Sequence, residues 1–256
     1  MPLGMSAGVE LSFRLRQALS WSPTPSTTPL LRLSALRAAL DLHEAGRFDV
    51  LERRRELEPL TRATSLLGAR EALWAIDTLD HLLGDTVLPA GPSLDVGAKN
   101  ATHLPGLFAF RPGPWDLVEV DPHRRYVDLT TRGAHGKAMA ARFRGARYIA
   151  KDIRDVSGRY SLITWFLPFV VESPHHAWGL PQRLFAPSLT LAHVIGLLAE
   201  GGALVIVNQG EAEATVQRQL LHDVAGDLDV TDAGSLSRVL SPYKRERFGV
   251  VLRRPR

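Results

Sequence analysis

The sequence contains no cysteine among its 256 residues. This absence excludes disulfide bonds, thiolate nucleophiles, and zinc or iron–sulfur centres held by cysteine. The chain also lacks an apolar run near the roughly 18 residues that a membrane-spanning helix needs. No basic segment followed by an apolar one opens the sequence, so the pattern of a secretory signal is missing. We therefore expect a cytoplasmic protein with no membrane partner.

The composition is that of an ordinary globular protein, with 45% hydrophobic and 23% charged residues. The length allows one large domain or two small ones. The net charge of +4 comes from basic residues of the second part, clustered at 142–154 and 244–256. Such clusters can attract RNA or an anionic substrate, although arginines on outer helices are more often simply solvated.

The first third of the chain has helical patterns and no strand signal. Residues 1–29 are expected to be irregular, because 22–29 are rich in serine, threonine and proline. Apolar residues recur at helical spacing in 30–45, 48–58, 60–67 and 69–83, and Gly84 stands where a helix C-cap belongs. We predict an N-terminal arm and helical subdomain over 1–88.

From residue 89 onward, short β-rich runs alternate with helical segments. Strands are expected at residues 93–96, 117–120, 146–150, 161–166, 203–208, 228–230 and 248–252. The clearest helices are 188–200, which ends at a glycine pair, and 212–224. This alternation predicts an α/β fold with a doubly wound, mostly parallel sheet.

Two strands in this region end in acidic residues, as in a nucleotide-binding sheet. Asp95 lies near the end of the first strand and Gly97 follows it, and Gly97 lets the backbone approach a ligand closely. Asp121 ends the second strand and is the candidate for the two ribose hydroxyls of a nucleoside. Glu119 is the alternative for that role. Asp121 also fits an N-cap, since Pro122 follows it.

The loop after the third strand offers a contact for an adenine ring. Asp152 can accept a hydrogen bond from the exocyclic amine, and Ile153 can pack on the base. An ion pair between Asp152 and Arg154 in a solvated loop is equally compatible with the sequence. Trp165, near the end of the fourth strand, is either part of the same pocket or a core aromatic.

The order of these parts resembles the class I S-adenosylmethionine-dependent methyltransferases. The family's cofactor motif is similar to residues 94–99, its acids to Asp121 and Asp152, and its glycine pair before the fifth strand to Gly201 and Gly202. The resemblance covers about residues 88–256, so 89–256 is expected to be a Rossmann-like S-adenosylmethionine-binding domain. It implies a seven-stranded sheet with the last strand, 248–252, antiparallel. The cofactor-binding residues that it implies are Asp95, Gly97, Ala98, Glu119, Asp121, Asp152, Ile153 and Trp165.

The sequence departs from the family pattern at three places. Lys99 stands where the family has its second glycine, and Ser161 stands where an acid is common. Residues 166–169 read Phe-Leu-Pro-Phe instead of Asn-Pro-Pro-aromatic, which argues against methylation of base exocyclic amines.

Methyl transfer needs alignment of the acceptor, and a general base only where the acceptor must lose a proton. His175 and His176 follow the fourth strand, where ligands bind in open sheets, and have a suitable pKa range. Adjacent histidines in a loop are also common surface residues, and they lack a third ligand for a metal site. Tyr243 can line the acceptor pocket from the loop before the last strand.

The expected function is therefore an S-adenosylmethionine-dependent methyltransferase with an unidentified acceptor, a small molecule being favoured over RNA. The alternative is a non-catalytic protein that retains the methyltransferase fold for binding or scaffolding, which Lys99 and Ser161 favour. A nicotinamide-dependent oxidoreductase fits less well, because the sequence lacks the G-x-G-x-x-G fingerprint of that class.

Overall fold

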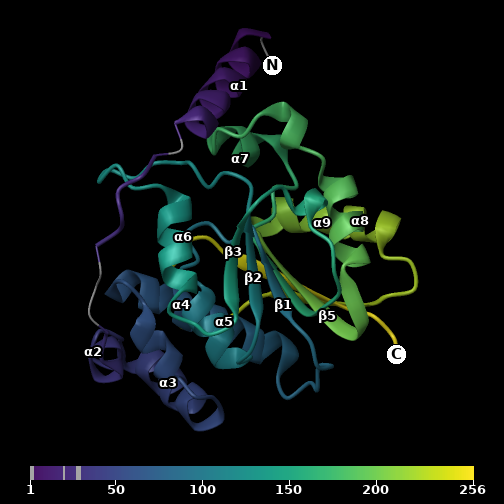
Figure 1. Ribbon diagram of the computed structural model, residues 1–256. Coiled ribbons are helices and arrows are strands. Elements are labelled where there is room, and N and C mark those ends of the chain that lie inside the picture. Colours follow the sequence, from purple (N-terminus) through teal and green to yellow (C-terminus); the bar gives the residue numbers. More distant parts are fainter. Residues whose placement is uncertain (1–2, 20, 27–29) are drawn as a thin grey trace.

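The core of the protein is a seven-stranded sheet with helices on both faces (Figure 1). The computed structural model describes residues 3–19, 21–26 and 30–256, with side chains from residue 8 onward. The strands are β1 Ser93–Val96, β2 Trp115–Glu119, β3 Ala146–Ala150, β4 Tyr160–Phe166, β5 Leu198–Gln209, β6 Asp229–Ser235 and β7 Arg247–Arg253. Their order is β3-β2-β1-β4-β5-β7-β6. Strands β1 to β5 pair in parallel, and β7 pairs antiparallel with both β5 and β6. The expected sheet, including its antiparallel last strand, is confirmed.

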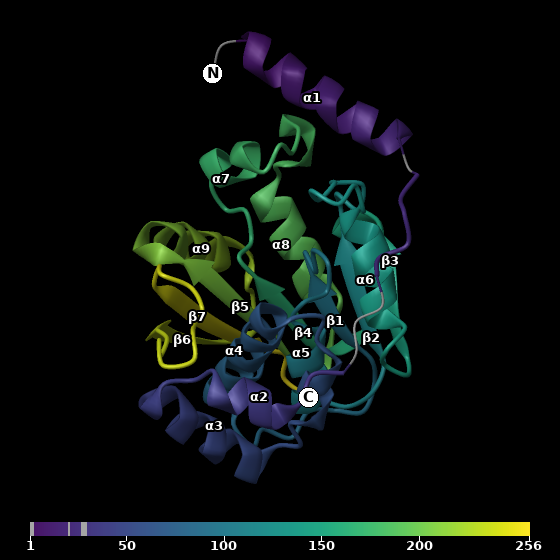
Figure 2. The same cartoon turned by 90° about the vertical axis from the view of Figure 1, so that its left-hand side faces the viewer.

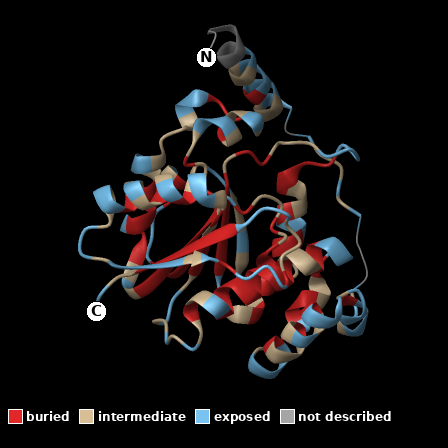
Figure 3. Cartoon of the chain, turned by 180° about the vertical axis from the view of Figure 1, so that it is seen from behind, coloured by how far each residue is buried: buried red, intermediate tan, exposed pale blue. Residues whose placement is uncertain are grey.

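Two apolar layers cover the sheet, one on each face. The helices are α4 Leu66–Leu83, α5 Leu104–Phe110, α6 Arg132–Ala140, α8 Pro187–Gly196 and α9 Gly210–Val224. Side chains of α4, α5 and α6 share a buried cluster with one face of the strands. Those of α8 and α9 share a cluster with the other face. Along β5, Val205 faces the first layer, and Leu204 and Ile206 face the second, as strand alternation requires. Figure 3 shows these strands buried between helices with exposed outer sides.

Helix α4 lies between the sheet and two further helices, α2 Leu33–Ala38 and α3 Leu42–Arg54. Its Trp74 and Leu79 belong to the cluster on the sheet. Its Leu73 and Ile76 belong to a separate cluster with Phe48 and other residues of the outer helices. Helix α4 therefore shares the core of the sheet, although it precedes the expected boundary at residue 88. No helix in the described ranges is long and apolar enough to cross a membrane.

The structure corrects several expectations about helices. The expected helix over 60–67 is broken, because a 3-10 turn ends at Arg62 and α4 begins at Leu66. Leu3–Ala18 forms helix α1, although residues 1–29 were expected to be irregular; residues 1–2, 20 and 27–29 of that segment lie outside the described residues. The expected helix over 30–45 is interrupted, because Asp41 starts a new helix through a capping box with Glu44. Helix α8 ends at Gly196, and Leu198 already pairs with Tyr160 in the sheet, so the expected helix to residue 200 is too long.

One short helix and three 3-10 turns complete the part of the chain that the structure describes. Helix α7 is Glu172–Ala177, and the turns are Glu58–Arg62, Ile153–Asp155 and Gln182–Leu184. Figures 1 and 2 show α1 next to α7, beyond the carboxyl ends of the parallel strands. The N-terminal helix and the segment between β4 and α8 thus lie at the same end of the sheet, where the parallel strands have their carboxyl ends.

Candidate functional site

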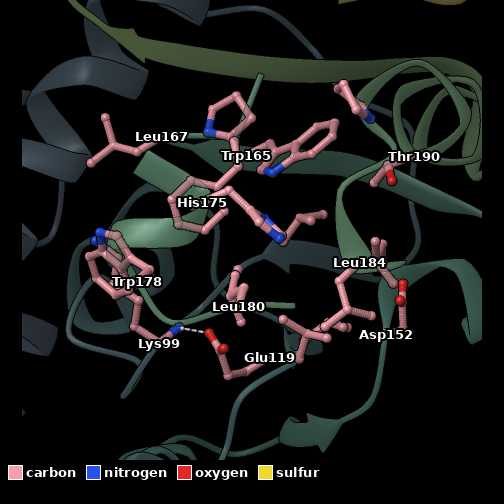
Figure 4. Close-up of a pocket in the computed structure, with 18 of the residues that line it drawn as sticks. Lys99, Glu119, Asp152, Trp165, Leu167, His175, Trp178, Leu180, Leu184 and Thr190 are labelled. Carbon is pink, nitrogen blue, oxygen red and sulfur yellow. Dashed lines mark hydrogen bonds between the residues drawn. The ribbon is translucent and has the colours of Figure 1, made fainter. Parts of the chain in front are cut away.

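A pocket opens at the carboxyl ends of the parallel strands (Figure 4). It encloses about 900 Å³ of space, part of which is open to solvent. Strand ends and their loops form its floor, and the segment between β4 and α8 forms its cover. The lining includes Val96, Gly97, Lys99, Glu119, Arg132, Asp152, Ile153, Trp165, Phe166, His175, Trp178, Leu180 and Leu184. Its size and mostly apolar walls are those of a small-molecule site.

The turn after β1 brings backbone to the wall of the pocket. Gly97 has a φ of +71°, and a Cβ built on it meets no atom within 4 Å. Its N–H and that of Ala98 both donate to the carbonyl oxygen of Val118 at 2.9 Å. The side chain of Ala98 is buried in the core and does not line the pocket. Of these two candidates, Gly97 alone offers its surface to a ligand.

Glu119 ends β2 and lines the pocket with a fixed carboxylate. Its Oε2 accepts from the backbone N–H of Lys99 at 2.9 Å (dashed line in Figure 4). Its Oε1 accepts from the N–H of Asp121 at 2.8 Å and from Nη1 of Arg132 at 3.0 Å. A carboxylate has about four acceptor positions, so one on Oε2 remains for a ligand hydroxyl.

Asp121, the first candidate for the ribose contact, does not line the pocket. Its side chain is fully buried, and Oδ2 accepts from Nη2 of Arg16 in α1 at 3.2 Å. The same Nη2 donates to the carbonyl oxygen of Gly179 at 2.8 Å. Arg16 therefore joins the end of β2 to the cover of the pocket. Of the two candidates, Glu119 lines the pocket and Asp121 does not.

Asp152, Ile153 and Trp165 line the pocket together, as expected for an adenine-binding region. Asp152 accepts from the backbone N–H of Arg154 at 2.9 Å and forms an ion pair with its guanidinium at 2.6 Å. Burial tends to raise the pKa of Asp152, but the hydrogen bonds from Arg154 outweigh it and hold the pKa below its ordinary value. Asp152 is thus paired with Arg154 and also borders the pocket, and its contact with an adenine amine stays a prediction.

Asp95 is buried beneath the turn and does not line the pocket. Its Oδ1 accepts from Oγ1 of Thr164 at 2.7 Å. Burial raises the pKa of Asp95 to about 7, although the Thr164 hydrogen bond and the charge of Lys99 oppose this effect. Asp95 thus supports the turn from below without contacting the space above it.

The two candidate histidines separate in the structure. His175 is buried and lines the pocket, and its Nε2 lies 3.0 Å from the carbonyl oxygen of Pro181. Because a carbonyl only accepts, Nε2 carries the proton and Nδ1 is left as the basic nitrogen. Burial lowers the pKa of His175. His176 does not line the pocket; its ring centroid lies 5.5 Å from that of His175.

Tyr243 belongs to an aromatic cluster on the α4 side of the sheet and does not line the pocket. Its hydroxyl lies 3.4 Å from Nε2 of His103. Its ring makes an edge contact with Trp74, at 5.0 Å between centroids, and Arg247 lies over it at 4.6 Å. Burial raises the pKa of Tyr243. Tyr243 therefore packs against the core on the α4 side, and the expectation that it lines the pocket is wrong.

Sequence reasoning missed a group of side chains around Trp178. Lys99 Nζ lies 5.2 Å from the centre of this ring, and the guanidinium carbons of Arg124 and Arg132 lie at 5.4 and 5.2 Å. The three cations come from separate segments, so no spacing in the sequence joins them. The only available signal was Lys99 in the place of a glycine.

No known protein-family model and no curated protein matches this sequence. Solved structures do match it. An S-adenosylmethionine-dependent methyltransferase from Aquifex aeolicus has a TM-score of 0.50 at 13% identity, covering 71% of this chain and 92% of that one. The chain has the class I methyltransferase fold.

Two further solved structures are similar at lower TM-scores. A methyltransferase from Pyrococcus furiosus gives 0.49 at 12% identity, covering 72% of this chain and 83% of that chain. The N-methyltransferase NodS from Bradyrhizobium japonicum, in complex with S-adenosyl-L-homocysteine, gives 0.46 at 15% identity, covering 73% and 88%. At these identities the likeness concerns the fold alone.

The methyltransferase fold explains where the pocket lies. The strand order reverses between β1 and β4, because β2 and β3 lie on one side of β1 and β5 on the other side of β4. Crossover helices diverge at such a reversal and leave a crevice at the carboxyl ends of the strands. Gly97 and Trp165, which follow or end these two strands, both line the pocket at that crevice.

Proposed function

We propose that this protein binds S-adenosylmethionine in the pocket and transfers its methyl group to a small-molecule acceptor. The observation that carries the proposal is the crevice between β1 and β4, with open space above Gly97 and the carboxylate of Glu119 at the end of β2. Open α/β sheets bind nucleoside-bearing ligands at this place.

The residues that line the pocket fit the parts of this cofactor. The free acceptor position of Glu119 suits a ribose hydroxyl, and Asp152 suits an adenine amine, with Ile153 beside it. Gly97 leaves room for the ligand at the turn. The bound cofactor supplies a methyl group already activated by a sulfonium, so the protein has to align the acceptor and exclude water.

A small acceptor is favoured by the cover of the pocket. Phe169, Trp178, Leu180 and Leu184 close it from the segment between β4 and α8. His175 is the only one of the three catalytic candidates that lines this space. Its Nδ1 is the nitrogen that would take a proton from an acceptor hydroxyl or amine.

A non-catalytic binding protein is the second candidate, and one contact favours it. Nη1 of Arg132 forms an ion pair with Oε1 of Glu119 at 3.0 Å. The backbone N–H of Lys99 donates to the other carboxylate oxygen. A cation beside the ribose-binding carboxylate competes for its lone pairs. A protein that binds S-adenosylmethionine but transfers no methyl group to any of a panel of small acceptors would identify this alternative.

Calorimetric titration with S-adenosylmethionine and S-adenosylhomocysteine tests the proposal. We expect binding at submillimolar ligand, and we expect Glu119→Gln to weaken it by about 10-fold, since a hydrogen bond to a charged group contributes about 1.5–3 kcal/mol. The matched control is Glu200→Gln, an exposed residue at the start of β5. No heat with either ligand would overturn the proposal.

A second measurement separates loss of the contact from loss of the fold. The wild-type protein should bind adenosine more tightly than 2′,3′-dideoxyadenosine, and Glu119→Gln should abolish this preference. The ratio of the two affinities is insensitive to partial unfolding, because both ligands are titrated into the same protein.

A further inference from the structure

Lys99 and Arg132 line one end of the pocket, and Arg124 joins them around the indole of Trp178. Lys99 comes from the turn after β1, Arg124 from the loop after β2, and Arg132 from the first residue of α6. Arg124 also donates from Nη1 to the carbonyl oxygen of Trp178 at 2.5 Å, which ties the backbone of Trp178 to the loop after β2. Figure 4 shows Trp178 and Lys99 at one end of the pocket and Asp152 at the other.

Acidic neighbours offset these charges only in part. Arg132 is 6% exposed and pairs through Nη1 with Glu119, while its buried Nε has no partner among the described residues. The ammonium group of Lys99 makes no hydrogen bond or ion pair within the described part of the chain, although its backbone N–H is bonded to Glu119. Asp121, whose charge acts on Arg124, accepts a hydrogen bond from Arg16.

The electrostatics of Lys99 agree with this geometry. Burial lowers its pKa and the charge of Arg132 lowers it further, while Glu71, Glu119 and Asp95 act in the opposite direction without compensating. Burial and the charge of Arg132 likewise lower the pKa of Arg124. Partly buried cations that repel one another are stabilised when an anion joins them.

We propose that Lys99, Arg124 and Arg132 form an oxyanion-binding subsite, so that the molecule in the pocket presents a carboxylate or phosphate group to the Trp178 end. Lys99 Nζ, which has no hydrogen-bond partner within the described part of the chain, is the donor, and Arg132 adds a second positive charge beside it. Charge-assisted bonds of this kind are strong. The inference deepens the proposed function, since it names the chemistry of the bound group. Two sources supply that chemistry: the acceptor, or the amino-acid end of the cofactor.

Calorimetry with three probes distinguishes these sources. S-adenosylhomocysteine carries the amino-acid carboxylate, and 5′-methylthioadenosine lacks it. Inorganic phosphate, titrated at constant ionic strength into the free and the S-adenosylhomocysteine-saturated protein, stands for an oxyanion of the acceptor. The variants are Lys99→Met and Lys99→Arg. Lys137→Met is the control, because Lys137 is an exposed lysine on the neighbouring α6.

Each source predicts its own pattern. If the cofactor supplies the anion, Lys99→Met weakens binding of S-adenosylhomocysteine about 10-fold and leaves binding of methylthioadenosine unchanged. Lys99→Arg then restores the preference for S-adenosylhomocysteine over methylthioadenosine. If the acceptor supplies it, both nucleosides bind Lys99→Met normally and phosphate binding falls about 10-fold. Lys137→Met behaves as the wild-type protein in either case. Lys99→Gln is the substitute variant if Lys99→Met does not fold.

Two results would overturn the subsite. One is a wild-type protein that neither binds phosphate nor prefers S-adenosylhomocysteine to methylthioadenosine. The other is a Lys99→Met variant that changes phosphate binding and the nucleoside ratio by less than twofold. If no nucleoside binds the wild-type protein, the proposed function fails, and phosphate binding to the free protein still decides the subsite.

Discussion

The carboxylate of Glu119 accepts a hydrogen bond of 2.9 Å from the backbone N–H of Lys99, which ties the end of β2 to the turn after β1. The N–H of Asp121 and the guanidinium of Arg132 hold the other carboxylate oxygen. Three chain segments thus fix one side chain at the floor of the pocket. A carboxylate oriented in advance loses little conformational freedom when a ligand hydroxyl binds to it.

Gly97→Ala should weaken ligand binding and stability together. The φ of +71° at Gly97 disfavours any side chain by about 1–2 kcal/mol, and the new methyl group enters the pocket. Gly226→Ala is the control, because Gly226 has a similar φ of +56° in open space away from this pocket. Chemical unfolding should show comparable losses for both, whereas titration with S-adenosylhomocysteine should show a loss for Gly97→Ala alone. Equal affinities in the two variants would place the ligand elsewhere.

Asp95 should make stability depend on pH. Its pKa is about 7 in the folded protein and near its ordinary value of 3.8 in the unfolded chain, so the folded state binds more protons between these values. The free energy of unfolding should therefore fall as the pH rises from about 4 to about 7. Asp95→Asn should flatten this fall.

Urea unfolding across that pH range measures the effect. Asp227→Asn, at an exposed aspartate after α9, should keep the wild-type slope. An unchanged slope in Asp95→Asn would show that Asp95 is ionised throughout the range in the folded protein.

The contacts of Arg16 should hold α1 and the cover of the pocket together. Arg16→Met and Asp121→Asn should each increase hydrogen exchange in 172–184, because each breaks the link between Asp121 and Gly179. The double variant should exchange no faster than the single ones, with a coupling of about 0.5–3 kcal/mol. Arg14→Met, which removes an exposed pair within α1, is the control. Additive effects would mean that the two residues act separately.

Tyr243→Phe should affect stability and leave ligand binding unchanged. The change removes the hydroxyl near Nε2 of His103 and leaves that buried nitrogen without its partner, at a cost of about 1–3 kcal/mol. Burial lowers the pKa of His103 to about 3, so the ring stays neutral and its hydrogen bond matters at every working pH. Thermal unfolding and titration with S-adenosylhomocysteine measure the two quantities. A clear loss of affinity for S-adenosylhomocysteine would show that Tyr243 contributes to the binding site.

The sheet could be predicted because its strands are short, apolar and separated by helical patterns. Every expected strand is present, with β3 at its expected bounds of 146–150. Helix α1 escaped prediction for the opposite reason. Among its side chains from residue 8 onward, Phe13 is in the core while Leu11 and Leu15 are exposed, so these residues form no apolar stripe of the usual kind.

The candidate site was predicted in outline and corrected in detail. Gly97, Glu119, Asp152, Ile153 and Trp165 line the pocket as expected. The sequence favoured Asp121 over Glu119, but the two acids have the same chemistry and lie two residues apart, so no local property of the chain separates them. The choice depends on Arg16, which is 105 residues away from Asp121 along the chain and engages its carboxylate.

The sequence alone determined the α/β class, the parallel strands and the acids at their carboxyl ends, because periodicity and residue type are local properties of the chain. Tertiary structure alone decided which acid faces the pocket, which histidine lines it, and that Lys99, Arg124 and Arg132 share one aromatic ring. Those relationships depend on distances between segments far apart in the sequence, and only the packed sheet and its cover fix such distances.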